Sequence, residues 1–491
     1  MLPFQGIIKR APCVENQHVF YLWALFIEMR KSHYGLAYCY LTLLFATILQ
    51  AATAQNADLY KPVHTDLKQK EQINSYVKNV NQQMFKELDG QFRKEKKDVY
   101  KYWFTEIDTL LASRRIFYSA KHNSYLKAIA TEIVKANPAL AQMSFEILFT
   151  RDAQINAAAL PNNLLFVHMG TLLSCENESQ LAFVVAHEMA HLYLNHSGKR
   201  LETSLQYQNS KETQAELKRI KNMEYGKREL VEALGKNMAF SYTKRSRDHE
   251  LQADSMALAL LQSTRFDVGE CTTAMDILDK SDSLDFDAEK AIVQVFSSPG
   301  LNFKKRWLQK EDGLLGGHAE LEKEEHADSL KTHPDCKIRK EKLQQMLGAT
   351  PFGLRSKNVV DESLFQNFKQ EFIYESLYYP YENYSYSLAL YYCLQQLSKN
   401  ENDGFAVILL GKTMNSLYEV QKKHRLSMHV HLPAPRRPKP YNTVLQFIQN
   451  LFLEDIAAIN YSFLQKHEAA LNSMPEFKSV LNTARLNAQK H

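Results

Sequence analysis

The chain has 491 residues, of which 45% are hydrophobic and 23% are charged, and its formal net charge at pH 7 is +5. This length exceeds one ordinary domain, and the balance is that of a globular protein with enough apolar material for a sizeable core. The small positive charge gives no reason to expect a nucleic-acid partner.

Residues 1–54 are predicted to be an N-terminal extension and a secretory signal peptide. Arg30 and Lys31 precede an uncharged run of 15 residues from Gly35 to Leu49, and Ala52-Thr53-Ala54 follows it. A basic segment, an apolar segment and small residues in this order are typical of a signal peptide, cleaved here after Ala54. The alternative is an uncleaved membrane anchor, although the run is short for a spanning helix. We therefore expect an exported protein of the periplasm or cell envelope.

The following region, residues 55–350, is predicted to hold helices and a small sheet. Apolar residues at helical spacing and then a change to strand-like alternation define these elements. The predicted helices cover residues 76–92, 99–111 and 123–136, and the predicted strands cover 145–149, 156–160 and 164–167. An extended peptide can add to the edge of such a sheet through main-chain hydrogen bonds, whatever its side chains.

The strongest chemical motif is His187-Glu188-Met189-Ala190-His191, inside the apolar run Leu181–His196, which predicts a buried helix. Residues four apart share a helix face, so both imidazoles can reach one ion with Glu188 beside them. A catalytic zinc site also needs a third protein ligand. The metzincin position for it holds Ser197, and His196 lies about 140° around the helix from His191. His196 is therefore predicted to point away from the ion and to be structural.

Glu250 and Asp254 supply an E-x-x-x-D pattern on a second apolar helical segment. They share a helix face, so Glu250 can ligate zinc while Asp254 accepts the outer N–H of a ligating imidazole. His249 projects about 100° away from Glu250 and is not chosen as a ligand. Two further histidines in Met428–His431 could bind metal, but they lie in a basic, proline-rich stretch and are predicted to be exposed.

The order of these motifs resembles the gluzincin peptidase family M48, which includes HtpX, the mitochondrial OMA peptidase and the type-one CAAX prenyl protease. The resemblance covers about residues 120–345. It is carried by Asn156-Ala157, Pro161, Gly170–Leu173, Glu178-x-x-Leu181-Ala182, the H-E-x-x-H motif, Ser246-Arg247-x-x-Glu250-x-x-Ala253-Asp254 and Thr332-His333-Pro334.

This resemblance implies that residues 55–350 form a zinc metallopeptidase domain. The protein would then be a zinc metalloendopeptidase with one zinc ion per chain. The implied metal ligands are His187, His191 and Glu250, and the implied general base is Glu188. The resemblance also implies that Asn156 and Ala157 lie on the substrate-side strand, and that His333 and Arg339 stabilise the transition state. From the residues alone, a histidine before proline, as at His333, is more typical of a turn or cap.

The chain departs from the integral-membrane members, because the stretches before residue 178 and after residue 198 are polar rather than hydrophobic hairpins. It resembles instead a soluble, exported bacterial-type member with a C-terminal helical region. Prenylated substrates are therefore not expected, and a membrane surface is allowed as a partner but not required.

Residues 351–491 are predicted to be a helical C-terminal region. Tyr374–Leu397 and Gly404–Lys423 resemble one tetratricopeptide-like hairpin, without a clean repeat of about 34 residues. Pro433–Pro440 is predicted to be a stiff linker or exposed loop, and 442–487 to be mostly helical. This region either packs on the catalytic domain or recruits envelope protein partners.

Four cysteines follow residue 54, and they allow three disulfide connectivities or separate buried thiols. They are Cys175, Cys271, Cys336 and Cys393.

The sequence as a whole predicts an α+β, mainly helical fold of the zincin type. We expect a zinc-dependent metalloendopeptidase acting on unfolded or misassembled proteins in envelope quality control. The alternative is a metal-binding chaperone or scaffold of the envelope with little proteolysis, although the intact Glu188 argues against an inactive site.

Overall fold

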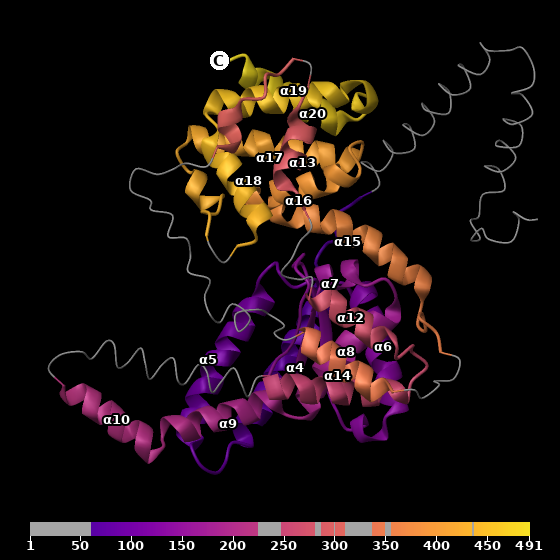
Figure 1. Cartoon of the computed structure of the whole chain (residues 1–491), viewed down its shortest axis with the longest axis vertical. Coiled ribbons are helices and arrows are strands. Elements are labelled where there is room, and N and C mark those ends of the chain that lie inside the picture. Colours follow the sequence, from indigo (N-terminus) through magenta and orange to yellow (C-terminus); the bar gives the residue numbers. More distant parts are fainter. Residues whose placement is uncertain are drawn as a thin grey trace, which may run out of the picture.

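The computed structural model describes residues 60–223, 247–279, 286–298, 300–309, 336–348, 355–434 and 437–491 (Figure 1). Helices dominate these ranges and surround one small three-stranded sheet, which confirms the predicted α+β, mainly helical fold class. The predicted signal peptide and His333 lie outside the described residues. Among the described helices, none is long and apolar enough to span a membrane.

The sheet has the strand order β1-β3-β2. Its strands are β1 (Glu146–Thr150), β2 (Ala157–Ala159) and β3 (Leu164–His168), with β1 parallel and β2 antiparallel to β3. The three strands predicted from alternation are thus confirmed to within two residues at each end. Because β2 pairs with β3 on one side and with no other strand in the described residues, its outer edge is a sheet edge.

Both faces of the central strand β3 are covered by helices. Leu164 and Phe166 pack in a cluster with residues of α4 (Leu67–Lys86) and α5 (Arg93–Ala112). Leu165 and Val167 face the opposite way, into the cluster around α6 (Ala120–Ala136) and α8 (Glu178–Tyr193). Successive strand residues point to opposite faces, so a strand buried on both faces needs a continuous apolar run.

Further helices complete the part of the chain that carries the sheet. They are η1 (Pro138–Leu140), α7 (Met169–Ser174), α9 (His196–Gln208), α10 (Lys211–Asn222), a helix over residues 247–262, α12 (Glu270–Asp279) and α14 (Cys336–Leu347). In Figure 1, α10 extends away from the rest of this part, beyond α9, whose first half faces α5.

A second core lies in the upper half of Figure 1 and is entirely helical. Its elements are α13 (Ala288–Phe296), η3 (Lys305–Leu308), α16 (Tyr386–Lys399), α17 (Gly404–Lys422), η5 (Leu426–Met428), α18 (Lys439–Asn450), α19 (Leu453–Leu471) and α20 (Pro475–Ala488). Here α13 and η3 come from inside the region assigned to the peptidase domain by sequence, yet they pack with the C-terminal helices. The two cores therefore interleave along the chain.

The long helix α15 (Glu362–Glu382) connects the two cores (Figure 1). Its first half is buried in the core around the sheet (the sheet-side core) through Phe365, Phe368 and Phe372. Leu377, on its second half, belongs to the C-terminal core. The prediction of one helix over Tyr374–Leu397 is wrong. Helix α15 ends at Glu382, and Tyr384 adopts a left-handed φ of 58° before α16 begins. The hairpin in this region is formed by α16 and α17.

The start of α8 is attached to the start of α15 by one buried carboxylate. Glu178, which is fully buried, accepts hydrogen bonds from the backbone N–H groups of Val359 (2.5 Å), Val360 (2.6 Å) and Asp361 (2.7 Å), and from the Tyr125 hydroxyl (2.7 Å). The carboxylate thus lies at the N-termini of two helices, where their dipoles and free N–H groups favour a negative charge. The helix with the H-E-x-x-H motif is therefore fixed to the C-terminal half.

The four cysteines of the described chain are separate buried thiols, which answers the question that the sequence left open. Burial raises the pKa of Cys175 and Cys271 to about 12. These side chains therefore act as small apolar core residues.

Replacing Glu178 by glutamine tests the attachment of α8 to α15. The amide has one acceptor oxygen and no charge, so at least one backbone N–H loses its partner, and we expect the free energy of unfolding to fall by about 3 kcal/mol. Urea denaturation measures this change. Glu176→Gln, two residues earlier on an exposed side chain, should stay within about 0.5 kcal/mol of the native protein. Equal stabilities for the two variants would contradict the assignment.

Candidate metal centre

Two helices bring the predicted ligands together. Helix α8 carries His187 and His191, and the helix over residues 247–262 carries Glu250. The two Nε2 atoms lie 3.0 Å apart, and the Glu250 carboxylate lies 3.3 Å from His187 Nε2 and 3.5 Å from His191 Nε2. Among the described residues, these three form the one group of metal-binding side chains whose ligand atoms lie within 4.8 Å of one another.

The donor set and its spacing fit a zinc ion. Zinc–nitrogen bonds of 2.0–2.1 Å in a tetrahedron place neighbouring ligand atoms about 3.3 Å apart, close to the three separations found here. Two imidazoles and one carboxylate are also among the usual ligand types of catalytic zinc sites. Two ring nitrogens directed at one point, with a carboxylate beside them, favour a cation between them.

Asp254 and Arg339 support this ligand set from behind. Asp254 Oδ1 lies 3.0 Å from His187 Nδ1, the ring nitrogen that faces away from the other ligands. Arg339 donates two hydrogen bonds to the same carboxylate, at 2.7 and 2.8 Å, and its Nη1 lies 3.1 Å from Glu250 Oε2. The structure thus brings the predicted residue Arg339 to the site, where its buried guanidinium contacts the two carboxylates.

The charges of the cluster explain its protonation without metal. Burial opposes a charge on His187, but Asp254 and Glu250 outweigh it and raise the pKa of this imidazole to about 10. Burial and the neighbouring His187 lower the pKa of His191 to about 3. Burial alone would raise the pKa of Glu250, yet His187 and Arg339 hold it well below its usual range. A proton on His187 therefore supplies positive charge that a bound metal ion would replace.

Glu188 lies between the ligands and the sheet edge. It is 6% exposed, and burial raises the pKa of its carboxyl to about 7, with His187 opposing and Glu250 adding to the rise. The backbone of Ala159 in β2 also hydrogen-bonds this carboxyl and lowers its pKa. A carboxyl that titrates near neutrality suits a general base.

Asn156 and Ala157 lie at the start of the edge strand. Asn156 precedes β2, and its backbone is held by the Thr171 hydroxyl and by the N–H of His168. Its side chain accepts a hydrogen bond from the N–H of Ala157. The strand that runs past Glu188 is therefore held on its inner side by β3 and at its start by Asn156.

His196 is not among the metal-binding side chains, as predicted, but the helical angle from which its direction was predicted does not apply. Helix α8 ends at Tyr193, and Asn195 takes a left-handed φ of 51° before α9 begins, so the helical angle does not extend to His196. The chain turns back, and His196 Nδ1 lies 2.9 Å from His191 Nδ1. His196 is still no ligand, because it contacts the outer nitrogen of His191. Its ring also stacks on His249, with centroids 4.3 Å apart.

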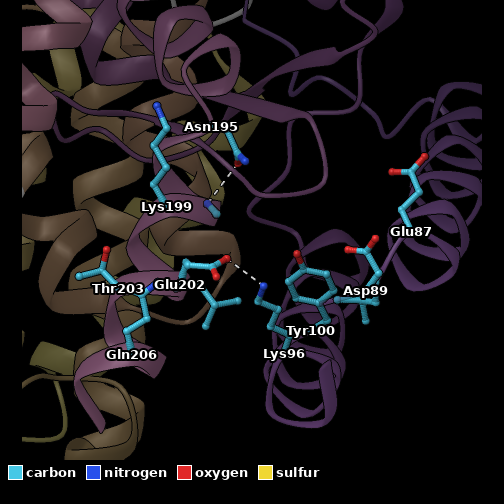
Figure 2. A pocket seen from close by; sticks show the side chains of 12 residues that line it. Glu87, Asp89, Lys96, Tyr100, Asn195, Lys199, Glu202, Thr203 and Gln206 are labelled. Carbon is cyan, nitrogen blue, oxygen red and sulfur yellow. Dashed lines mark hydrogen bonds and ion pairs between the residues drawn. The ribbon is translucent and has the colours of Figure 1, made fainter. Parts of the chain in front are cut away.

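The turn that returns His196 has its own supports, which Figure 2 shows. The Asn195 side chain accepts a hydrogen bond from the N–H of Gly198, and a Cβ at this glycine would lie 2.4 Å from the Asn195 oxygen. Across a polar pocket, Lys96 of α5 forms an ion pair with Glu202 of α9 at 2.8 Å. Together these contacts hold the start of α9 against the site.

The hydrogen bonds then determine the tautomers of both rings. With Nε2 of His191 directed to the metal position, its Nδ1 carries the proton and donates to His196 Nδ1. His196 must then carry its proton on Nε2, which lies 3.2 Å from the side-chain oxygen of Gln252. An oriented imidazole and amide thus fix His191, whereas the carboxylate of Asp254 fixes His187.

Metal analysis of single variants tests the ligand set. His187→Gln, His191→Gln and Glu250→Gln should each lose the zinc, because each removes one of three ligands. Glu188→Gln, which removes no ligand, should keep one zinc ion per chain. Elemental analysis after dialysis measures the content, and zinc retained by the Glu250→Gln variant would rule out this carboxylate as the third ligand.

Replacing His196 by leucine tests its support of His191. We expect zinc to be lost to a competing chelator at 10- to 100-fold lower chelator concentration, the usual effect of removing an outer partner of a ligating histidine. His196→Asn, whose oxygen can accept the same N–H, should restore part of the affinity. His467→Leu, a buried histidine of the C-terminal core, is the control, and an equal loss in this variant would refute a specific effect.

Comparison with known proteins agrees with this geometry. Residues 120–347 match the model of Peptidase family M48. The chain is 30% identical to "Metalloendopeptidase OMA1, mitochondrial" of Bos taurus over 105 residues, which cover 21% of this chain and 19% of that protein. It is 30% identical to "Mitochondrial metalloendopeptidase OMA1" of Schizosaccharomyces pombe over 128 residues, or 26% and 36% of the two chains.

A third relative is the "Putative beta-barrel assembly-enhancing protease" of Vibrio cholerae, 30% identical over 149 residues, which are 30% of each chain. The matched part thus spans between about a fifth and about a third of these relatives. The range matched by the family model, residues 120–347, contains the sheet, helix α8 and the second ligand helix. The match to peptidase family M48 therefore covers residues 120–347, which contain the metal-binding cluster of His187, His191 and Glu250.

Proposed function

We propose that the protein is a zinc metalloendopeptidase that hydrolyses peptide bonds of protein substrates. The observation that carries this proposal is the placement of Glu188, which lies beside a three-ligand cluster and against the edge strand β2. Ligands alone would support a structural metal. A buried carboxyl with a pKa of about 7, next to a strand that can hold a peptide, adds what hydrolysis requires.

His187, His191 and Glu250 would hold the zinc ion and leave one position open for water. When bound, zinc supplies a Lewis acid for the scissile carbonyl and lowers the pKa of a water molecule. Glu188 accepts the proton of the attacking water and passes it to the leaving amine. The outer edge of β2 binds the substrate in extended form through main-chain hydrogen bonds, which align the scissile bond with Glu188.

Two further residues complete the proposed machinery. We assign to His333 the donation of a hydrogen bond to the developing oxyanion, following its place in the family motif. Arg339 acts on the same step through the carboxylates it contacts, because it holds Glu250 and Asp254 in position behind the ligands. A positive charge so close to the site also favours the negative charge that develops there.

We further propose that the protein is exported and removes unfolded or misassembled proteins of the cell envelope. The signal-peptide pattern of residues 1–54 supports export. Recognition through main-chain atoms at β2 suits substrates that have no fixed sequence but expose extended backbone. The name of the Vibrio cholerae relative, an assembly-enhancing protease, agrees with such a role. Residues 351–491 provide the surface on which envelope partners would dock.

Casein hydrolysis by native protein and by Glu188→Gln tests the peptidase proposal. We expect the variant to be at least about 100-fold slower, because it lacks the general base, and to keep its zinc. A chelator should abolish activity of the native protein, and added zinc should restore it. Glu176→Gln, the same change on an exposed side chain, should cleave at the native rate.

Other outcomes point to the rival function. In one such outcome, the native protein and the Glu188→Gln variant suppress aggregation of a denatured substrate equally, and neither cleaves it. This result would identify a metal-binding chaperone. Cleavage that survives both the chelator and the Glu188→Gln change would exclude this site as the source of activity.

A further inference from the structure

The segment that joins α17 to α18 is strongly basic. From Val420 to Leu453 the sequence holds six Lys or Arg residues and three histidines, with no Asp or Glu. Lys422, Lys423, Arg425 and Lys439 are exposed in the structure. The remaining two basic residues of the segment are Arg436 and Arg437. Such a concentration of one sign produces a local positive potential.

Exposed apolar side chains occur on the same surface. Met428 is 72% exposed, Leu432 is 68% exposed, and Tyr384, in the turn between α15 and α16, is 63% exposed. The turn and the segment are in contact, since His429 Nδ1 lies 3.1 Å from the carbonyl oxygen of Tyr384 and the His429 ring stacks on Tyr386. Basic and apolar groups are therefore presented together.

The backbone holds these apolar side chains outward. Val430, two residues from both Met428 and Leu432, is 5% exposed and belongs to the C-terminal core, which anchors this stretch of backbone. His431 is fixed by a 2.6 Å contact of its Nδ1 with the Tyr441 hydroxyl, and the Asn442 side chain donates to the carbonyl of Ala434. The exposure of Met428 and Leu432 thus belongs to a fixed conformation.

Acidic side chains near this surface are already paired. Glu419 lies 3.7 Å from Lys423, and Glu382 lies 3.1 Å from Arg114. Glu419 therefore offsets part of the charge of Lys423, one of the basic residues of this segment.

We propose that this surface, defined by Tyr384, Lys422, Lys423, Arg425, Met428, Leu432 and Lys439, binds an anionic lipid bilayer. Basic side chains are attracted to anionic headgroups, and apolar side chains beside them enter the boundary between headgroups and acyl chains. An acidic protein partner would use the charges but would leave the protruding Met428 and Leu432 without a matching pocket. The combination favours the bilayer, which accepts apolar groups anywhere along its surface.

This binding is independent of the proposed peptidase reaction, since the surface lies on the C-terminal helices and contains none of the metal-binding residues. It would place the enzyme at the membrane face while substrate hydrolysis takes place in the other half of the chain.

Vesicle flotation of the full chain tests the proposal, with Glu188→Gln in every sample to prevent self-cleavage. The vesicles are phosphatidylcholine alone or a mixture with phosphatidylglycerol. The variants are a basic triple, Lys422→Gln, Lys423→Gln and Arg425→Gln, and an apolar pair, Met428→Ser and Leu432→Ser. All samples share one N-terminus, so differences between variants report this surface.

We expect tighter binding to the anionic vesicles, weakened by raising the salt from 0.1 to 1 M, because the screening length falls from about 10 to about 3 Å. Each Lys or Arg near an anionic surface contributes roughly fivefold, so the basic triple should bind on the order of 100-fold more weakly. The apolar pair should also bind more weakly, including at high salt, where the attraction between charges is screened.

Matched controls come from the opposite end of the chain. Leu67 and Tyr102 are 69% and 64% exposed, and Lys68, Lys78 and Lys94 are exposed lysines. The apolar control carries Leu67→Ser and Tyr102→Ser, and the basic control carries glutamine in place of the three lysines. Both controls should bind anionic vesicles as tightly as the parent protein does. Unchanged melting temperatures verify that all variants fold.

Three results would overturn the proposal. In the first, the basic triple binds anionic vesicles as tightly as its control. In the second, the basic triple binds these vesicles more weakly but the apolar pair does not. In the third, the protein binds soluble polyglutamate more tightly than anionic vesicles. The second would exclude entry of Met428 and Leu432 into the bilayer, and the third would identify an acidic polypeptide as the partner.

Discussion

The contact on which the site depends is the buried pair of Arg339 and Asp254. Removing two charges from water costs several kcal/mol per ion, and only full satisfaction of their hydrogen-bonding groups offsets this cost. Here two guanidinium nitrogens bind the carboxylate, and His187 takes up its remaining capacity. The consequence is a rigid connection of α14, the helix over 247–262 and α8. These three segments are far apart in sequence, and each would leave a buried charge uncompensated if it moved away.

The two imidazole ligands are supported in unequal ways. His187 has an anionic partner on its outer nitrogen, which strengthens it as an electron donor, whereas His191 has the neutral ring of His196. A neutral partner orients the ring but adds less negative charge to the centre. In the proposed reaction, a second carboxylate behind His191 would, beside Glu250, lower the Lewis acidity that a bound zinc ion offers to a substrate carbonyl. The arrangement thus combines firm orientation with a limited negative charge.

Much of this site could be predicted from sequence, because it depends on local periodicity. The spacing of His187 and His191 and that of Glu250 and Asp254 each require only one helical turn, and the strands beside them alternate regularly. The direction predicted for His196 rested on the wrong geometry, because the prediction continued the helix through Asn195. The sequence Asn195–Gly198 indicated the end of the helix, because asparagine readily takes the left-handed conformation that ends a helix. The pairing of Arg339 with Asp254 joins residues 85 positions apart, and no local pattern encodes such a contact. The break between α15 and α16 was missed because apolar spacing continues on both sides of Tyr384.

The path of the chain between its two cores has a consequence for how the molecule folds. The chain enters the C-terminal core at α13, returns to the sheet-side core at α14, and leaves again along α15, whose two halves belong to different cores. Neither core is therefore built from one continuous stretch of sequence. Both must close long loops before their contacts form, which slows folding. Because α15 and the Glu178 carboxylate link the cores, melting one core removes packing and hydrogen bonds from the other. The architecture thus favours a single cooperative transition over the stepwise unfolding of two independent domains.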